Sequence, residues 1–298
     1  MKNKLLKKKV IVVSTLAGVL LIAGVSAFTL FFKQGKAHEN SNAGKNEVKT
    51  SSTTSHVIGY PEGYDTTSEG ASSYKNSGDH DNSPYYPKLD VYNMKSTDTL
   101  TLISEFETYQ QTKEVTCGPS SALMVLNHFG ENKYDELEIA ERVKCNKDLN
   151  GNNKEQPGVA NERGEIGTAT DRMVEFFKEI GWEVQSSVDE ADKDGYSFQE
   201  YDEFKDFTIK NLKENTPIMI EWIDWSGHWA TIIGYDTMGT ESTADDVLIL
   251  ADPYDTSDHA QDGYQIYSAP RFFYMWLDTR CLPEELSKQQ WVVAKPTT

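Results

Sequence analysis

Residues 117–130, with the sequence CGPSSALMVLNHFG, form the stretch that decides the fold. Their apolar side chains recur at helical spacing, Pro119 suits a first helical turn, and Gly130 is a typical helix stop. The stretch therefore predicts a helix that begins at Cys117. Because the free N–H groups and the dipole of a helix N-terminus favour negative charge, this cysteine is a candidate thiolate nucleophile. A structural cysteine on a core helix is the alternative.

Elements with two kinds of periodicity extend outward from this helix. Apolar residues at helical spacing predict three further helices, at residues 134–143, 168–180 and 199–214. Residues 182–184 are predicted to form a short strand. After residue 216 the pattern changes to short apolar runs, which predict strands at 217–222, 228–235 and 247–251. Helices followed by antiparallel strands indicate an α+β domain, which we place at residues 98–298.

A cysteine nucleophile needs a base, and the predicted strands supply one. His228 opens the strand 228–235, and the strand 247–251 is expected to return antiparallel to it. This hairpin would bring Asp252, directly after the second strand, beside His228. A carboxylate there can accept a hydrogen bond from the imidazole and fix its tautomer, as in a triad of nucleophile, base and orienter. A histidine that only completes the core is the alternative.

Gln111 lies six residues before Cys117. A side-chain amide held there could, together with the Cys117 backbone N–H, stabilise the oxyanion of an acyl-transfer intermediate, although an exposed glutamine is the usual state. Two other histidines are weaker candidates for the base. His128 is about 16 Å from Cys117 along the same helix, at about 1.5 Å per residue, and no apolar strand holds His259.

Three motifs occur in an order that resembles the papain-like cysteine peptidases: Gln111-x5-Cys117-Gly118-Pro119, the run GHWATIIGYD at 227–236, and Ala251-Asp252-Pro253. They are most similar to the double-glycine (bacteriocin-processing) peptidases and their stand-alone relatives, and the resemblance covers roughly residues 104–295. It implies a papain-like fold, with a helical lobe packed on an antiparallel β-sheet and a cleft between them. It also implies a peptide or protein as the substrate and a cysteine-type peptidase as the activity.

The resemblance implies a role for each of four residues: Gln111 as oxyanion donor, Cys117 as nucleophile, His228 as general base and acid, and Asp252 as orienter of the imidazole. No ATP-binding motif or multi-span region occurs in the sequence, in contrast to the leader-processing members, which are fused to a transporter. The resemblance therefore does not extend to the double-glycine substrate. Peptidyl or acyl transfer by the same cysteine, and a catalytically silent peptide-binding domain, remain alternatives to hydrolysis.

The N-terminal residues differ from the rest of this acidic chain, which carries 29 basic and 47 acidic residues and a net charge of -18. Residues 10–32 contain no charged side chain and follow five lysines. Such a segment spans a hydrocarbon core of about 30 Å, and the upstream lysines keep the N-terminus cytoplasmic. We therefore predict a cytoplasmic segment at 1–9, a transmembrane signal-anchor at 10–32 and an extracellular domain. Secretion after cleavage near Val25-Ser26-Ala27 is the alternative.

Residues 33–97 are rich in Ser, Asn, Gly and Thr and poor in aliphatic side chains, which predicts a flexible polar linker. Its tyrosines, at positions 60, 64, 74, 85 and 86, could dock on the folded domain or contact the cell wall, although a plain linker is favoured.

The remaining expectations concern partners, metals and thiols. The acid excess argues against nucleic-acid binding, because phosphate contacts need clustered Lys and Arg. No cofactor or metal is expected, since no Cys/His cluster has metal-ligand spacing. Cys145 and Cys281 could form a disulfide in an exported protein or stay as buried thiols.

Overall fold

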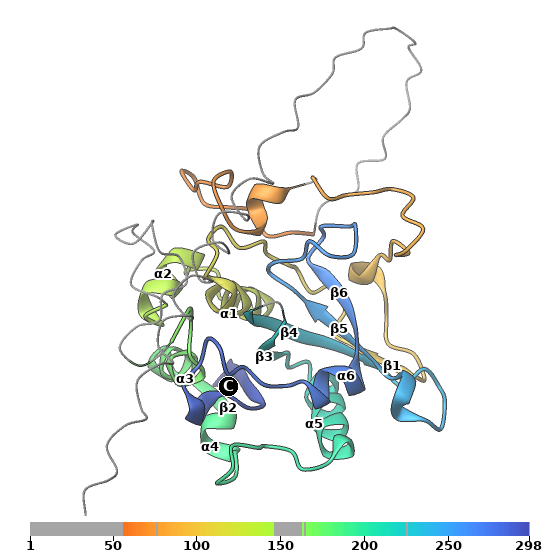
Figure 1. Ribbon diagram of the computed structural model, residues 1–298. Coiled ribbons are helices and arrows are strands. Elements are labelled where there is room, and N and C mark those ends of the chain that lie inside the picture. Colours follow the sequence, from red (N-terminus) through yellow and green to blue (C-terminus); the bar gives the residue numbers. More distant parts are fainter. Residues whose placement is uncertain (1–55, 76, 146–162, 164, 225, 298) are drawn as a thin grey trace, which may run out of the picture. The chain divides into compact units, whose positions relative to one another are not determined.

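The computed structural model describes residues 56–75, 77–145, 163, 165–224 and 226–297, which belong to a unit that spans Thr53–Thr298 (Figure 1). The predicted cytoplasmic segment at 1–9 and the predicted anchor at 10–32 lie outside the described residues. Of the helices that are described, none is both long and apolar enough to cross a membrane.

Four of the helices lie close to their predicted positions: α1 (Cys117–His128), α2 (Glu136–Arg142), α3 (Thr170–Glu179) and α5 (Tyr201–Lys213). Asp135 caps α2 by accepting a hydrogen bond from Glu138 N at 2.8 Å, and Glu200 and Glu203 form a capping box at α5. The sequence did not predict two shorter helices, α4 (Ser187–Glu190) and α6 (Ala269–Tyr274). One-turn 3₁₀ helices lie at Ala71–Tyr74, Val91–Asn93, Thr243–Asp245 and Glu284–Leu286.

The described strands form one antiparallel sheet in the order β2-β7-β3-β4-β5-β6, with β1 paired to the far end of β4. Four of them fall on predicted strands: β2 (Trp182–Ser186), β3 (Ile218–Ile223), β4 (Gly227–Asp236) and β5 (Val247–Ala251). Three were not predicted: β1 (Leu100–Leu102), β6 (Tyr264–Ser268) and β7 (Gln290–Pro296). The antiparallel pairing and the separate helices confirm the α+β class.

The two faces of the sheet carry different helices. Neighbouring residues of a strand point to opposite faces, as His228 and Trp229 do in β4. Trp229 packs against α1, because a Cβ on Gly118 would lie 3.3 Å from its ring. His228 shares its face with Trp222 of β3, whose ring lies 5.6 Å from that of Phe272 in α6. Figure 1 accordingly shows α1, α2 and α3 on one side of β3 and β4, and α5 and α6 on the other. The first turn of α1 therefore meets the beginning of β4.

Residues 56–75 and 77–97, here called the strap, pack along the loops of the domain and are drawn in orange in Figure 1. Backbone hydrogen bonds run from Ile58 N to Thr108 O at 2.7 Å and from His80 N to His259 O at 3.0 Å. Ala71, inside the strap, is completely buried.

The prediction of a flexible linker is thus wrong for the strap, while residues 33–55 lie outside the described residues. Composition misled because the strap is held by hydrogen bonds to particular loops and by a few apolar side chains, such as Val91, that pack on the core. Two of its tyrosines dock on the domain: the Tyr60 hydroxyl donates to Gln110 O at 3.0 Å, and that of Tyr64 donates to Asp135.

Candidate active site

Cys117 is the first residue of α1 and lies on a cleft of about 410 Å³. The cleft is also lined by Gln111, Glu221, His228, Arg280 and Cys281. The preceding residue, Thr116, makes no side-chain cap to the helix. The first N–H groups of α1 are therefore not occupied by that hydroxyl and favour negative charge at the cysteine sulfur.

His228 and Asp252 meet as the predicted hairpin of β4 and β5 requires. His228 Nε2 lies 2.7 Å from Asp252 Oδ1, and both side chains are nearly completely buried. The same Oδ1 accepts a hydrogen bond from Tyr254 N at 2.8 Å, so two donors fix the carboxylate. Since Nε2 faces Asp252, Nδ1 is the ring nitrogen left for the Cys117 thiol, which lies close enough to raise the pKa of His228. The expected juxtaposition of the three side chains is present.

The surroundings of His228 act on its pKa in opposite directions. Burial lowers the pKa, whereas the charge and hydrogen bond of Asp252, and after them the Cys117 thiol, raise it. The carboxylate prevails, and the pKa of His228 lies well above its ordinary value. The imidazole is therefore suited to hold a proton taken from the thiol.

Gln111 is completely buried beside the cleft, but its amide hydrogens are engaged. Nε2 donates to Lys113 O at 2.7 Å and to Glu114 O at 3.2 Å, while Oε1 is buried without a hydrogen-bond partner. The reverse orientation of the amide would set Oε1 against two carbonyl oxygens. The structure thus places Gln111 next to Cys117, with its donors turned toward the loop that joins them.

Glu136, at the start of α2, is a buried carboxylate that the sequence analysis did not single out. It accepts four hydrogen bonds from the loop before Cys117: from Tyr109 Oη at 2.8 Å, Thr112 N at 2.8 Å, Thr112 Oγ1 at 2.7 Å and Thr116 Oγ1 at 2.5 Å. Burial raises the pKa of Glu136, and the hydrogen bonds from the two threonines and the tyrosine oppose that shift. One side chain therefore holds the conformation of the loop that carries Gln111.

Glu221 of β3 and Asp278 form a buried pair of carboxyl groups beside the cleft. Burial, and next the neighbouring carboxyl group of Asp278, raise the pKa of Glu221 well above its ordinary value, which favours the neutral form of Glu221. The pair also explains the glycine before His228. A Cβ on Gly227 would fall 2.2 Å from Asp278 Oδ2 and 2.5 Å from Cys281 Cβ.

All three cysteines are buried free thiols, so the suggested bond between Cys145 and Cys281 is not formed. The Cys145 thiol donates to Val115 O at 3.0 Å, and burial raises its pKa to about 12. Cys281 accepts a hydrogen bond from Gly227 N at 3.2 Å, and burial raises its pKa as well.

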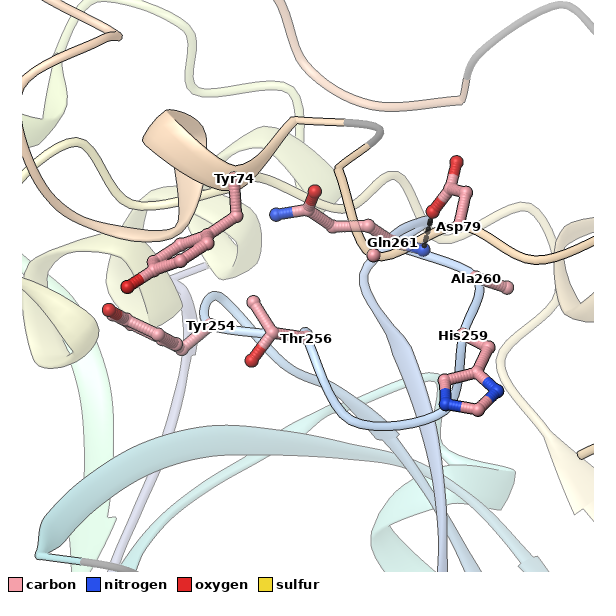
Figure 2. A pocket seen from close by; sticks show the side chains of 8 residues that line it. Tyr74, Asp79, Tyr254, Thr256, His259, Ala260 and Gln261 are labelled. Carbon is pink, nitrogen blue, oxygen red and sulfur yellow. Dashed lines mark hydrogen bonds between the residues drawn. The ribbon is translucent and has the colours of Figure 1, made fainter. Parts of the chain in front are cut away.

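The two rival histidines lie elsewhere. His128 closes α1, and its Nε2 lies 3.1 Å from Asn215 O. His259 bonds through Nδ1 to Ser83 Oγ of the strap at 2.7 Å. It borders a separate pocket of about 280 Å³, shown in Figure 2 between strap residues Tyr74 and Asp79 and the loop after β5. Of the histidines that the structure describes, His228 is the one that lines the cleft.

Comparison with known proteins agrees with this geometry. No curated protein matches the chain. The model described as the Peptidase_C39 like family matches residues 103–282, which include Gln111, Cys117, His228 and Asp252. The match covers more than half of the 298 residues. The fold, the cleft and this match together establish that the chain belongs to the Peptidase_C39 like family.

Proposed function

We propose that the chain is a membrane-anchored, extracellular cysteine peptidase that hydrolyses peptide bonds through a thioester on Cys117. The observation that carries the proposal is the buried 2.7 Å contact between His228 Nε2 and Asp252 Oδ1, on the cleft that Cys117 also lines. It leaves one ring nitrogen of the base for the thiol and fixes the ring by a carboxylate.

The first half of the reaction forms the acyl-enzyme. His228 Nδ1 takes the proton of the Cys117 thiol, and the thiolate attacks the carbonyl carbon while the oxygen receives the electron pair of the carbonyl bond. The Cys117 N–H stabilises this oxyanion, and Gln111 is the second donor, for which one Nε2–H would be shared between the oxyanion and the loop carbonyl to which it now donates. His228 then gives its proton to the departing amine as the C–N bond breaks.

The second half releases the acyl group. Water attacks the thioester carbon as His228 takes one of its protons. The C–S bond then breaks, the Cys117 thiolate regains a proton from His228, and the product leaves as a carboxylic acid that loses its remaining proton to solvent. An amine that attacks in place of water would give transfer, for which the same residues serve.

Product analysis on a peptide library tests this function. We expect the full-length protein to produce peptides with new C-terminal carboxylates, and Cys117→Ala to produce none. The same incubation with an added amine acceptor measures transfer. Products that form only with the amine would identify a transferase. Peptide binding with no products under either condition would identify a silent binding domain, and either result would overturn hydrolysis.

The location rests on the uncharged segment 10–32 and the lysines before it. Protease added to intact cells should remove the domain from the membrane fraction, while a cytoplasmic marker protein survives. Protection of the domain from the protease would contradict an extracellular location. A mature N-terminus close to Phe28 would contradict the anchor and favour secretion.

A further inference from the structure

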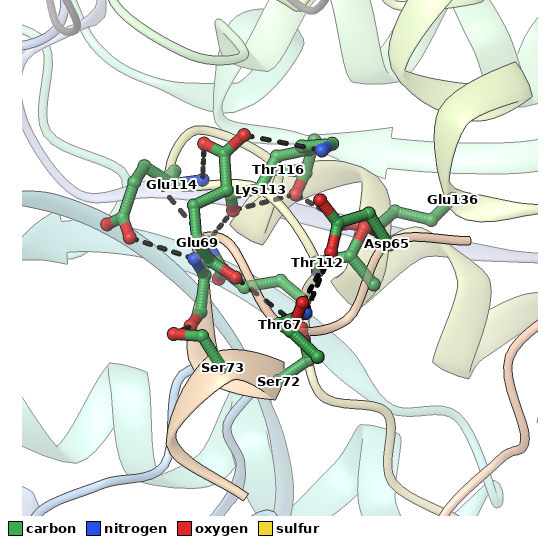
Figure 3. A network of polar contacts seen from close by, with 12 residues as sticks. Asp65, Thr67, Glu69, Ser72, Ser73, Thr112, Lys113, Glu114, Thr116 and Glu136 are labelled. Atoms are coloured by element: carbon green, nitrogen blue, oxygen red, sulfur yellow. Dashed lines mark hydrogen bonds and ion pairs between the residues drawn. The ribbon is translucent and has the colours of Figure 1, made fainter.

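The loop between β1 and α1, residues 103–116, carries Gln111 and is here called the catalytic loop. The strap contacts this loop at the residues that hold the Gln111 side chain. Figure 3 shows strap residues, Glu69 among them, against Lys113 and Glu114 of this loop. The Lys113 ammonium donates to Glu69 Oε1 at 3.3 Å, and Glu114 N donates to Glu69 Oε2 at 3.4 Å. In return, Gly70 N donates to Glu114 Oε1 at 2.9 Å. Ser72 N donates to the backbone carbonyl of Gln111 itself at 3.1 Å.

Gly70 makes the closest approach of the strap to this loop. Its backbone has a φ of 69°, and a Cβ at this position would lie 2.7 Å from Gln111 O, 2.7 Å from Thr112 C and 2.8 Å from Lys113 N. All three are backbone atoms, which cannot rotate away as the end of a side chain can. The strap therefore packs on the catalytic loop, backbone against backbone, without room for one methyl group.

On its other side, the strap is hydrogen-bonded to the loop between β5 and β6. Gln261 Nε2 donates to Ala71 O at 2.7 Å, and Gln261 belongs to the loop between β5 and β6. Residues 70–72 thus lie between the loop that carries Gln111 and the loop that follows Asp252. The catalytic loop itself is held by Glu69 on the strap side and by Glu136 on the α2 side.

These contacts connect the strap to the Gln111 side chain beside the cleft. Gln111 Nε2 bonds to the carbonyls of Lys113 and Glu114, and these are the two residues that Glu69 holds. A shift of the strap would move the two carbonyls, and the amide of Gln111 with them. The strap lies outside residues 103–282, so the family match does not account for it.

We propose that strap residues 69–72 are positioning residues of the active site, which set the Gln111 amide through the carbonyls of Lys113 and Glu114. This inference rests on the proposed peptidase function. It differs from a purely structural role because it requires an effect on the chemical step that depends on Gln111.

The chain offers a matched pair of glycines for the test. Gly63 also has a positive φ, of 89°, but a Cβ there would meet no atom within 4 Å. In the full-length protein, Gly70→Ala and Gly63→Ala carry the same kind of backbone strain, and only Gly70→Ala pushes on the catalytic loop. We expect kcat to fall about tenfold or more in Gly70→Ala with little change in KM, and to stay at the wild-type value in Gly63→Ala.

A double substitution separates positioning from stability. If the strap acts through Gln111, then Gly70→Ala should cost little further kcat once Gln111→Ala is present. Equal losses with and without Gln111, or a Gly70→Ala protein as active as Gly63→Ala, would overturn the proposal. If Gly70→Ala does not fold, the milder Glu69→Gln is compared with Glu62→Gln, an exposed strap residue. Glu69→Gln should lower kcat several-fold, and equal activities of the two would overturn the proposal.

Failure of the strap proposal and failure of the proposed function are distinguishable. A wild-type protein without Cys117-dependent peptide turnover removes the function, whatever the strap does. A wild-type protein with such turnover, and with the same kcat in both glycine variants, removes only the role of the strap.

Discussion

His228 Nε2 and Asp252 Oδ1 lie 2.7 Å apart at the start of β4 and just beyond the end of β5. Burial alone would lower the pKa of His228, and the carboxylate reverses that effect. The charge of Asp252 therefore decides over which pH range the imidazole keeps a proton.

Asp252→Asn should shift the pH dependence of activity more than it lowers the maximum. The amide keeps an oxygen that can accept from His228 Nε2 and Tyr254 N, but it removes the negative charge. The imidazolium should then lose its proton at lower pH, which ends the thiolate–imidazolium pair earlier. We expect the alkaline limb of kcat/KM to move down by about one pH unit. A pH–rate profile of the variant measures this shift.

Asp252→Ala removes the acceptor as well and should cost more activity, while His228→Ala should nearly abolish turnover. His259→Ala is the control, because this ring bonds to Ser83 of the strap and should leave activity unchanged. Wild-type activity in Asp252→Ala combined with an inactive His259→Ala would show that the triad is assigned to the wrong residues.

Glu136→Gln should destabilise the domain and reduce activity together. The carboxylate accepts four hydrogen bonds, and an amide would aim N–H groups at donors. We expect a loss of about 2–4 kcal/mol in the free energy of unfolding, measured by urea denaturation. Glu138→Gln, on the exposed side of the same helix, should change this free energy by less than about 0.5 kcal/mol. Equal stability of the two variants would contradict the role given to Glu136.

Asp255→Asn should stabilise the domain at alkaline pH. Burial, and next the charge of Asp258, raise the pKa of Asp255 from 3.8 to about 9 in the folded state. The folded protein thus keeps a proton that the unfolded chain releases, so stability falls as pH rises from about 4 to about 9. Relative to wild type, the variant should gain several °C in Tm at pH 8, from about 1–3 kcal/mol, and little at pH 4. The exposed Asp98→Asn is the control. An equal gain in Tm in both variants would show that the raised pKa of Asp255 is not the cause.

The three thiols should react at different rates with iodoacetamide at pH 8. A pKa of about 12 for Cys145, against an ordinary 9.0, makes its thiolate about a thousandfold rarer. Burial raises the pKa of Cys281 too, whereas Cys117 has an imidazole beside it. Peptide mapping should find Cys117 modified first, and all three modified equally in urea. Equally fast labelling of Cys281 in the native protein would contradict this order.

The sequence predicted those parts of the fold in which local periodicity and tertiary position agree. The stretch that became α1 is apolar on a helical period, and β4 and β5 are apolar runs that follow each other in the sequence, joined by residues 237–246. Their hairpin geometry was enough to place Asp252 beside His228. The family motifs added Gln111, but not the direction of its amide, which depends on two carbonyls of the same loop.

Strands with distant partners could not be predicted in the same way. β7 lies inside the sheet between β2 and β3, yet its pairing partners lie far back in the sequence, at 182–186 and 218–221. β6 follows a loop and exposes part of its residues, so its alternation is weak. The strap is polar, and its hydrogen bonds to distant loops leave no periodic signal. Glu136 likewise acquires its role only where Tyr109, Thr112 and Thr116 converge on it.

The central claim is that Cys117 carries the acyl group during turnover. Acid quenching of the full-length protein during steady-state cleavage of a peptide, followed by peptide mapping by mass spectrometry, tests this most directly. The account predicts an acyl adduct, labile to hydroxylamine as a thioester is, on the peptide that contains Cys117. It also predicts neither adduct nor turnover in Cys117→Ala. Turnover that persists in Cys117→Ala, with no adduct on the wild-type cysteine, would contradict the account.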